Sequence, residues 1–370
     1  MAGVERRECL GRSRHSWRLH RDGCSCGRHT PDARLMQAPV AVGPTLVSRL
    51  GVVVIGRNEG ERLRRCLTSV LGAGRTVVYV DSGSTDDSVA LAMSLGAVVH
   101  QLDMGRPFTA ARARNEGARR LATAEPRIDI VQFVDGDCEV VPGWLAAAAG
   151  HLGDRPEVAV VCGRRREQHP ERSVYNLLCD LEWNTPIGLA KSCGGDAAIR
   201  FAALRESGGY RDSMIAGEEP ELCVRLRARG WQIWRIDQEM TLHDAAILRF
   251  GQWWKRSVRA GYAYGIGAHL HGAPPERHWV RELRSALFWG LVLPVSLLAA
   301  GAVLSGWSAL GLLAYPLQML RLFLRSNGSL RERLARSFFL VLGKFAEAAG
   351  AIRFMVHRAS GANSRLIEYK

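Results

Sequence analysis

Short apolar runs and helical stretches alternate between residues 51 and 240, which predicts βαβ units around a mostly parallel sheet. The strands are expected at 51–55, 76–80, 97–101 and 128–134, and the helices at 59–71, 86–95 and 109–121. Ser84 or Thr85 is expected to cap the second of these helices, because acidic residues follow that suit the first turn of a helix.

Polar residues follow the ends of three of these strands. Asn58 comes after the first strand, Asp81 after the second, and Asp135 with Asp137 after the fourth. In open α/β sheets, ligands bind outside the carboxyl ends of the strands. We therefore expect these four side chains to gather along one edge of the sheet and to form a binding site there.

An uncharged apolar run of 36 residues, 285–320, lies in the C-terminal part of the chain. One membrane span needs about 20 residues, so the run is long enough for two short helices joined near residues 305–308. Arg281 and Arg284 precede the run, and Arg321 and Arg325 follow it. Because basic residues favour the cytoplasmic side, the run is predicted to form a transmembrane hairpin with both ends in the cytoplasm. A buried helical hairpin of a soluble protein is the alternative.

The two ends of the chain are expected to differ. Residues 1–45 have no periodic pattern and no apolar run long enough for a secretory signal. They are predicted to be a disordered extension, or a non-native one if translation begins at Met36. Residues 338–356 are apolar but contain Lys344, Glu347 and Arg353, which predicts an amphipathic helix at the membrane interface.

The formal charge of +14 is concentrated at the ends of the chain. Residues 1–50 hold 9 basic and 4 acidic side chains, residues 281–370 hold 12 and 4, and the residues between them hold 29 and 28. A nucleic-acid enzyme is expected to carry basic residues on its folded body, so nucleic acid is not expected as a partner. The basic tail beside the apolar run favours anionic membrane lipids. Nine scattered cysteines predict reduced thiols in a cytosolic compartment.

The candidate chemistry rests on acidic residues. The common nucleotide-binding loops are missing from their expected places, since no G-x-G-x-x-G follows the first strand and no G-x-x-x-x-G-K-[ST] occurs. Asp135 and Asp137 suit a hard divalent cation, which takes oxygen ligands. Glu218 and Glu219 begin a predicted helix, and either could act as a general base. His243 follows a strand and is a plausible ligand for a cation.

Six segments, taken in order, resemble the inverting family 2 glycosyltransferases of GT-A fold. They are residues 52–67, 80–88, 111–118, 132–139, 194–200 and 217–231. The resemblance covers about residues 50–260 and implies an α/β fold with a Rossmann-like mixed sheet flanked by helices, as in nucleotide-diphospho-sugar transferases. A C-terminal membrane region is common in bacterial members of this family.

The resemblance also implies residues that bind the nucleotide-diphosphate sugar donor. Asp81 would contact the nucleotide base, Asp135 would approach the ribose, and Asn58 would lie beside the nucleotide. The other donor-binding positions that it implies are Glu59 and, near the phosphates, Arg112 or Arg114.

The metal ligands and the catalytic base are implied in the same way. Asp137 would bind Mn²⁺ or Mg²⁺ on the diphosphate, and His243 resembles the histidine that completes the metal site in some members. The Glu-Asp motif that carries the base corresponds to Glu218-Glu219, so Glu219 stands where Asp is usual. The added methylene moves the carboxylate outward by about 1.5 Å, so Glu218 is the alternative base.

The acceptor side is expected at residues 180–195. Trp183, Gly194, Gly195 and Asp196 are predicted to shape it, with Trp183 either stacking on a sugar ring or packing in the core. The family's processive synthases carry Gln-x-x-Arg-Trp, whereas this chain has Gln-Trp-Trp-Lys-Arg at 252–256, which argues against a processive polymerase.

The predicted protein is thus a metal-dependent inverting glycosyltransferase acting on a lipid-linked or surface-polysaccharide acceptor, at the cytoplasmic face of a bacterial inner membrane. A sugar-nucleotide nucleotidyltransferase and a catalytically inactive nucleotide-sugar-binding membrane protein are the alternatives. The expected regions are the extension at 1–45, the catalytic domain at 46–260, a linker at 261–284, the hairpin at 285–324 and the amphipathic tail at 325–370.

Overall fold

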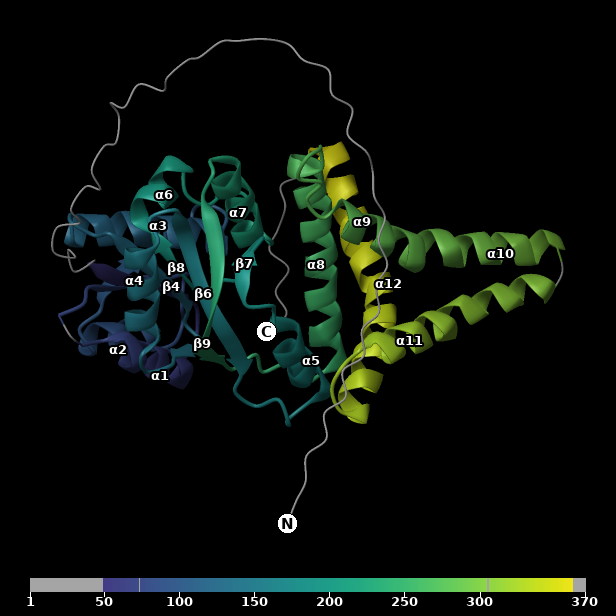
Figure 1. The fold of residues 1–370 in the computed structure, drawn as a ribbon, viewed down its shortest axis with the longest axis horizontal. Helices are drawn as coiled ribbons and strands as arrows, with labels where there is room; N and C mark the ends of the chain where they lie inside the picture. The colour runs from purple at the N-terminus through teal and green to yellow at the C-terminus, as the bar shows by residue number, and fades with distance from the viewer. Residues whose placement is uncertain (1–48, 73, 305, 362–370) are drawn as a thin grey trace, which may run out of the picture. The chain divides into compact units, whose positions relative to one another are not determined.

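The computed structural model describes residues 49–72, 74–304 and 306–361, so the extension expected at residues 1–45 lies outside the described residues. In the described part, nine strands form one mixed sheet in the order β3-β2-β1-β4-β8-β6-β9-β5, and β7 pairs with β9 (Figure 1). The strands are β1 (Leu50–Gly56), β2 (Val77–Asp81), β3 (Val98–Gln101), β4 (Ile130–Asp135), β5 (Cys138–Val140), β6 (Val158–Glu167), β7 (Gly188–Ala190), β8 (Ala197–Arg200) and β9 (Gln232–His243).

Helices follow most of these strands and continue into a C-terminal helical region. The sheet domain contains α1 (Glu61–Val70), α2 (Ser88–Ser94), α3 (Ala110–Ala124), α4 (Trp144–Asp154), α5 (Val174–Trp183), α6 (Phe201–Glu206) and α7 (Glu218–Ala228). The C-terminal region contains α8 (Phe250–His271), α9 (Val280–Leu287), η1 (Phe288–Val292), α10 (Leu293–Leu304), η2 (Gly306–Leu313), α11 (Ala314–Arg325) and α12 (Leu330–Ser360).

The register of the central strands places the predicted polar residues at one edge. β1 is buried and pairs in parallel with β2 on one side and β4 on the other. Gly56 lies opposite Asp81, and Ile55 lies opposite Asp135. The prediction that the strand ends meet along one edge is therefore confirmed. The predicted cap of the second helix is wrong, because α2 begins at Ser88 and its first residue receives no side-chain cap from Ser84 or Thr85.

An irregularity in β9 changes which side chains share a face. β6 and β9 are parallel, and Arg164 lies opposite Glu239 whereas the next residue, Arg165, lies opposite Thr241. The skipped residue, Met240, is buried like Thr241 beside it. A β-bulge of this kind shifts the alternation of side chains by one residue. The two halves of β9 therefore present different sets of side chains to each face of the sheet.

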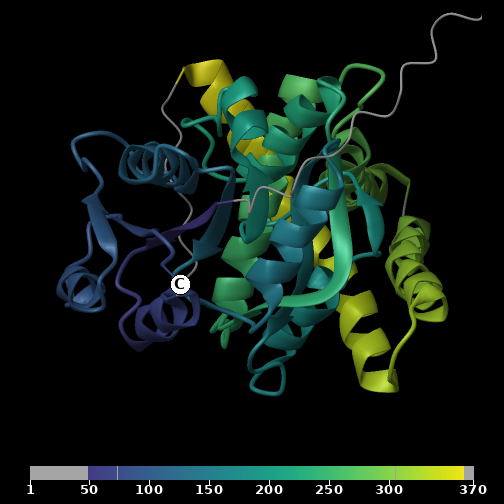
Figure 2. The ribbon, with the colours of Figure 1, turned by 60° about the vertical axis from the view of Figure 1, so that its left-hand side comes forward.

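A pair of long helices, α8 and α12, packs together beside the sheet domain. They lie side by side in both views, α8 in green and α12 in yellow (Figures 1 and 2). Tyr262 of α8 and Phe354 of α12 are buried with their rings 5.5 Å apart in an edge-to-face arrangement. The segment 261–284, expected as a linker, thus contains the second half of a packed helix. The expected amphipathic tail is a 31-residue helix with one face on α8.

The apolar run forms two antiparallel arms that extend away from α12 (Figure 1). Gly311 of η2 packs against Leu297 of α10, and the Tyr315 hydroxyl donates a hydrogen bond of 2.8 Å to the carbonyl of Trp289. Among the described residues, the segment Val280–Gly301 is long and apolar enough to cross a membrane, and 6% of its most apolar window is buried. This segment suits one span, and the transmembrane hairpin stays a prediction.

Candidate active site

Two loops at the carboxyl ends of β1 and β2 are joined by short hydrogen bonds. Asn58 has a positive φ of 56°, and its side-chain oxygen accepts a hydrogen bond of 2.7 Å from the Thr85 amide. The Asn58 amide donates to the Ser84 hydroxyl at 2.9 Å. The buried Asp81 carboxylate accepts from the Gly83 and Ser84 amides, each at 3.0 Å. The hydrogen bonds of Asn58 and Asp81 therefore fix the conformation of the two loops at this edge of the sheet.

Arg114 of α3 joins the carboxylates of two distant segments. Its side chain is 3% exposed, and its Nη1 lies 3.0 Å from both Glu218 Oε1 and Glu219 Oε1. Its Nη2 lies 2.8 Å from Asp135 Oδ1. Burial disfavours the charge, but the surrounding carboxylates raise the pKa of Arg114 well above its ordinary value. This arginine thus fixes the start of α7 relative to the end of β4.

Glu219 has the electrostatic properties of a general base. Burial and the neighbouring Glu218 carboxylate raise the pKa of Glu219 to about 7, against the opposing effect of Arg114. A base whose pKa is close to neutral can both accept and release a proton at physiological pH. Asp135 behaves in the opposite way, because Arg114 and Arg165 outweigh its burial and hold its pKa well below the usual range.

Gly217, the residue just before α7, is in close contact with the C-terminal region. Gly217 has a φ of +78°, and a Cβ atom there would lie 2.7 Å from the Trp279 ring. Only glycine combines this backbone conformation with so close an approach. Trp279 directly precedes α9, and farther along α7 Glu221 Oε1 lies 3.0 Å from Nε2 of His271 at the end of α8. The helix that carries Glu218 and Glu219 is therefore packed against the segment between α8 and α9.

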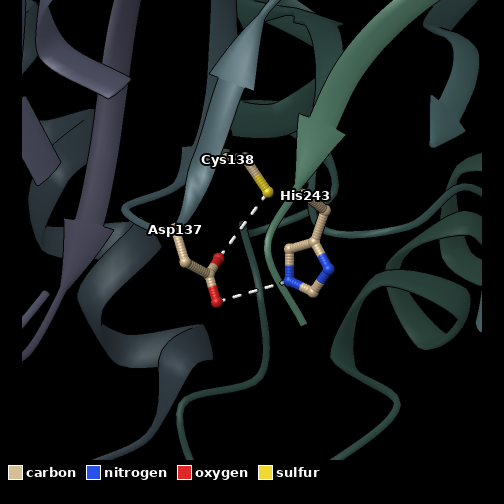
Figure 3. Close-up of side chains that lie close together, drawn as sticks. All are labelled: Asp137, Cys138 and His243. Atoms are coloured by element: carbon tan, nitrogen blue, oxygen red, sulfur yellow. Dashed lines mark hydrogen bonds and ion pairs between the residues drawn. The ribbon is translucent and has the colours of Figure 1, made fainter. Parts of the chain in front are cut away.

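Asp137, Cys138 and His243 form a buried cluster beside this network (Figure 3). His243 Nε2 lies 3.3 Å from Asp137 Oδ2, and the Cys138 thiol donates to Asp137 Oδ1 at 3.6 Å. Burial and the nearby Arg165 lower the pKa of His243 to about 4, so the imidazole is neutral near pH 7. Burial raises the pKa of Cys138 well above its ordinary value, so this side chain remains a thiol.

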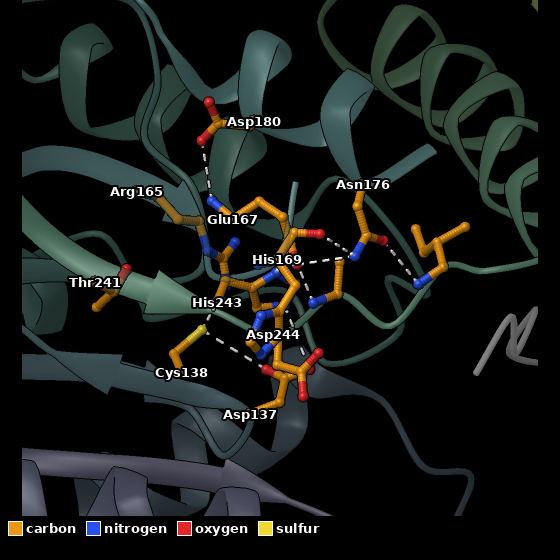
Figure 4. A network of polar contacts seen from close by, with 12 residues as sticks. Asp137, Cys138, Arg165, Glu167, His169, Asn176, Asp180, Thr241, His243 and Asp244 are labelled. Carbon is orange, nitrogen blue, oxygen red and sulfur yellow. Dashed lines mark hydrogen bonds and ion pairs between the residues drawn. The ribbon is translucent and has the colours of Figure 1, made fainter. Parts of the chain in front are cut away.

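A second set of side chains contacts His243 of this cluster (Figure 4). Glu167 Oε2 lies 3.8 Å from His243 Nδ1 and accepts a hydrogen bond from the Ala245 amide. Its other oxygen accepts a hydrogen bond from Asn176 at 3.0 Å. A carboxylate near Nδ1 favours the tautomer with the proton on Nδ1. The lone pair of Nε2 then faces the Asp137 carboxylate, so the two groups can share a cation.

Arg165 is a member of the site that the sequence prediction missed. Its guanidinium lies 2.9 Å from Asp135 and 3.0 Å from Asp196, and it stands 5.1 Å from the centre of the Trp183 ring. Trp183 in turn meets His243 edge-to-face at 4.8 Å. The sequence signal for this role was the run Arg164-Arg165-Arg166 at the end of a strand. Side chains alternate between the two faces of a strand, so the middle arginine points to the face opposite to its two neighbours.

Three of the predicted site residues make contacts that the local sequence did not indicate. Asp196 is fully buried, accepts a hydrogen bond from the Asp135 amide at 3.0 Å and another from Thr241 at 2.8 Å, so it positions Asp135 and cannot contact an acceptor. The Arg112 guanidinium donates to carbonyls of residues 103, 106 and 107, which leaves Arg114 as the arginine of the cluster. Glu59 pairs with Arg62 at 2.8 Å.

The two glycines predicted on the acceptor side differ in their surroundings. A Cβ atom on Gly195 would lie 2.6 Å from Arg114 Nη2 and 2.9 Å from Asp135 Oδ2. A Cβ atom on Gly194 would have only Arg165 Nη1 within reach, at 4.0 Å. The absence of a side chain at Gly195 thus leaves room for the Arg114–Asp135 ion pair. A side chain at Gly194 would not crowd an ion pair among the described residues.

We expect Gly195→Ala to separate Arg114 from Asp135 and to lower kcat/KM for the donor by about 100-fold, since misplacing a catalytic group by about 1 Å can have that effect. The matched variant Gly194→Ala should stay within about threefold of the wild type. Steady-state kinetics of both variants with the preferred donor, alongside their melting temperatures, would measure this. Equal activity of the two variants would contradict the role given to Gly195.

The chain is similar in sequence to known glycosyltransferases. Residues 51–204 match the model of glycosyl transferase family 2. A pre-mycofactocin glycosyltransferase of Mycobacterium tuberculosis is 31% identical over 209 residues, which are 52% of this chain and 42% of that protein. A probable glucomannan 4-beta-mannosyltransferase of Arabidopsis thaliana is 24% identical over 220 residues, 53% of this chain and 39% of that protein. The chain thus spans about two fifths of the length of these relatives.

A solved structure extends the likeness to the fold. A mannosyltransferase from Pyrobaculum calidifontis, in complex with GDP-Man and Mn²⁺, superposes with a TM-score of 0.60 at 19% identity, over 86% of this chain and 91% of that one. The mixed sheet and its flanking helices therefore have the GT-A fold. The segment from β1 into α6, residues 51–204, therefore matches glycosyltransferase family 2.

Proposed function

We propose that the protein transfers a sugar from a nucleotide-diphosphate sugar to an acceptor hydroxyl with inversion at the anomeric carbon. The observation that carries this proposal is the Glu219 carboxylate, whose pKa is about 7 and which Arg114 holds 3.0 Å away in the same network as Asp135. A direct displacement requires a base whose pKa is near the working pH and which lies next to the donor-binding edge of the sheet.

The donor occupies the edge formed by the ends of β1, β2 and β4 in this proposal. Asp81 contacts the nucleotide base, Asn58 and Glu59 lie beside the nucleotide, and Asp135 approaches the ribose. The M. tuberculosis relative is named as a glycosyltransferase, and the P. calidifontis protein was solved with GDP-Man. These names support a nucleotide sugar as the donor class.

The residues at the Asp137 cluster fit a divalent cation. Asp137 and His243 bring a carboxylate oxygen and a neutral imidazole nitrogen within 3.3 Å of each other, and Glu167 favours the tautomer that leaves this nitrogen free to bind. The Cys138 thiol is a poor partner for a hard cation. The surroundings are rich in carboxylates, which suits a cation that neutralises the charge of a departing diphosphate. Mn²⁺ or Mg²⁺ is the proposed cofactor.

The chain's own residues then provide the acid–base chemistry. Glu219 takes the proton of the acceptor hydroxyl as that oxygen forms a bond to the anomeric carbon. The bond from this carbon to the diphosphate breaks on the opposite face, so the configuration inverts. The nucleotide diphosphate leaves with the bonding electrons. This single displacement needs no second carboxylate as nucleophile, unlike the retaining glycosidases.

The acceptor is proposed to be lipid-linked or part of a surface polysaccharide, and the protein is proposed to lie at the cytoplasmic face of a bacterial inner membrane. The support for this is the apolar segment Val280–Gly301 and the exposed side chains along the two arms, among them Leu298, Leu313 and Leu317. Flanking arginines at positions 281, 284, 321 and 325 suit a cytoplasmic end.

Incubation of the purified full chain with a panel of UDP-, GDP- and dTDP-sugars tests the proposal. We expect one donor class to release free nucleoside diphosphate when Mn²⁺ or Mg²⁺ is present, and EDTA to suppress the release. Release of pyrophosphate from a nucleoside triphosphate would indicate a nucleotidyltransferase instead. Donor binding without release in the presence of membrane extract would indicate an inactive binding protein.

A further inference from the structure

A cavity lies between the sheet and the beginning of α12. Its volume is about 840 Å³, and its walls come from β6, β9, α5 and the turn between α11 and α12. Its lining is mostly polar and includes four arginines: Arg164, Arg166, Arg235 and Arg336. Glu219, Asp137 and His243 are not among the residues that line it, so the cavity is separate from the proposed active site.

The strand β6 separates the two sites. Arg164 lies 2.9 Å from Asp180 and Arg166 lies 2.7 Å from Glu239, both on the cavity side. Arg165 between them points to Asp135, and Figure 4 draws it beside the cluster of Asp137. Neighbouring side chains of a strand point to opposite faces. The bulge in β9 extends the separation, because Glu239 lines the cavity whereas Thr241 contacts Asp196.

Arg235 is the unusual member of the cavity. The residue is 4% exposed, and within the described residues its buried Nε has no hydrogen-bond partner. A buried arginine without a partner is costly, because the charge loses hydration and gains nothing in return. A guanidinium is also the side chain whose planar fork best matches a phosphate or carboxylate group.

The acidic residues of the cavity do not satisfy this charge. Asp180 and Glu239 pair with Arg164 and Arg166. Glu332 accepts a hydrogen bond of 2.7 Å from the Ser329 amide and caps α12. Asp237 is exposed to solvent. The opening also contains Arg336, which is exposed. An anion with several oxygens would meet the buried Arg235 and the exposed Arg336 from inside the cavity.

We propose that this cavity binds the phosphate of a lipid headgroup, with Arg235 as the buried contact and Arg336 at the opening. The location favours a lipid over a free phosphate. The turn that closes the cavity, Asn327-Gly328, is flanked by Leu324, Leu330 and Leu334, each of which is more than half exposed. Phosphate groups and apolar side chains lie at adjacent depths at a bilayer surface. The inference concerns binding alone and does not depend on the transferase assignment.

Thermal unfolding of the detergent-solubilised full chain tests the site. We expect mixed micelles containing phosphatidylglycerol to raise the melting temperature of the wild type by roughly 2–4 °C over micelles containing uncharged diacylglycerol. Inorganic phosphate at constant ionic strength and with EDTA, which suppresses cation-dependent binding at Asp137, should have a smaller effect. A response to inorganic phosphate but not to the lipid would overturn the lipid assignment.

Arg235→Met and Arg331→Gln distinguish a specific site from general charge attraction. Arg331 is an exposed arginine at the same end of α12 that does not line the cavity. Arg235→Met should abolish the lipid response and leave the lipid-free melting temperature equal or higher, because it removes an unpaired buried charge. Arg331→Gln should keep the response. If Arg235→Met lowers the lipid-free melting temperature and keeps the response, Arg235 is only a structural residue and the proposal is wrong.

Discussion

Replacement of Glu219 by glutamine is expected to lower kcat by about 10³-fold while leaving donor affinity within about threefold, because the amide keeps the volume of the side chain and loses the basic oxygen. The pH profile should change as well. Below pH 7 the Glu219 carboxyl of the wild type is protonated and cannot accept the acceptor's proton, so kcat/KM should rise as pH increases through about 7. Glu219→Gln should lose this rise. Transfer rates and calorimetric donor affinities between pH 5 and 9 would measure both effects.

Glu218→Gln is the matched control for this experiment. Glu218 lies at the same distance from Arg114 as Glu219 does, 3.0 Å, but it is more deeply buried, with 4% of its side chain exposed against 13%. We expect a loss of about 10-fold, from the altered position of Arg114. The rise of kcat/KM with pH should remain but move to lower pH, because the Glu218 charge no longer raises the pKa of Glu219. If Glu218→Gln abolishes both transfer and the pH dependence while Glu219→Gln stays active, the base is Glu218.

Replacement of Asp137 by alanine is expected to have the second large effect. It removes the carboxylate that faces His243 Nε2, and with it the proposed ligand for the cation. We expect Mn²⁺ affinity to fall by about 100-fold and cation-dependent transfer to fall by about 10³-fold. Titration calorimetry with Mn²⁺ alone and transfer assays at saturating donor would measure the two quantities separately.

Two further variants make the Asp137 experiment decisive. His243→Ala should weaken Mn²⁺ binding by a smaller factor, because the carboxylate remains. Glu61→Ala removes an exposed carboxylate of α1 whose partner is Arg64, and it should change neither quantity. Wild-type Mn²⁺ affinity in Asp137→Ala would contradict the metal assignment, whatever happens to the rate.

The sequence was sufficient to predict the central sheet and its binding edge. Each of the strands β1, β2 and β4 appears in the sequence as a short apolar run followed by a polar residue, and parallel strands bring such residues together. The start of α7 was predicted for the same reason, because two glutamates follow a glycine. These features depend on local pattern alone.

The partners of these residues could not be predicted from local pattern. Arg112 and Arg114 are two positions apart on one helix, so they point in very different directions, and only the tertiary packing decides which one meets Asp135. Asp196, which follows two glycines, was predicted on the acceptor side, yet it is buried and accepts a hydrogen bond from the Asp135 amide. The role of Arg165 depends on a bulge in a partner strand that comes about 75 residues later.

The C-terminal helix was harder to interpret for a different reason. Lys344 and Glu347 interrupt its apolar run, which suggested a membrane surface, but they pair with each other at 2.6 Å and are partly buried. The pair leaves Ala346, Ala351 and Phe354 to pack in the face toward α8. Contact with a membrane stays a prediction for the outer face, where Phe338 and Met355 are exposed.

The contact between Gly217 and Trp279 makes the catalytic helix dependent on residues that a soluble fragment would omit. A chain ended after α8, before Trp279, would lose the ring beside the first turn of α7 and the α12 face on which α8 packs. Such a fragment would keep every residue that has a proposed chemical role. The helix that carries Glu218 and Glu219 would nevertheless lose its contact with Trp279. The segment between α8 and α9 therefore supports the position of Glu219, although it contributes no residue to the proposed chemistry.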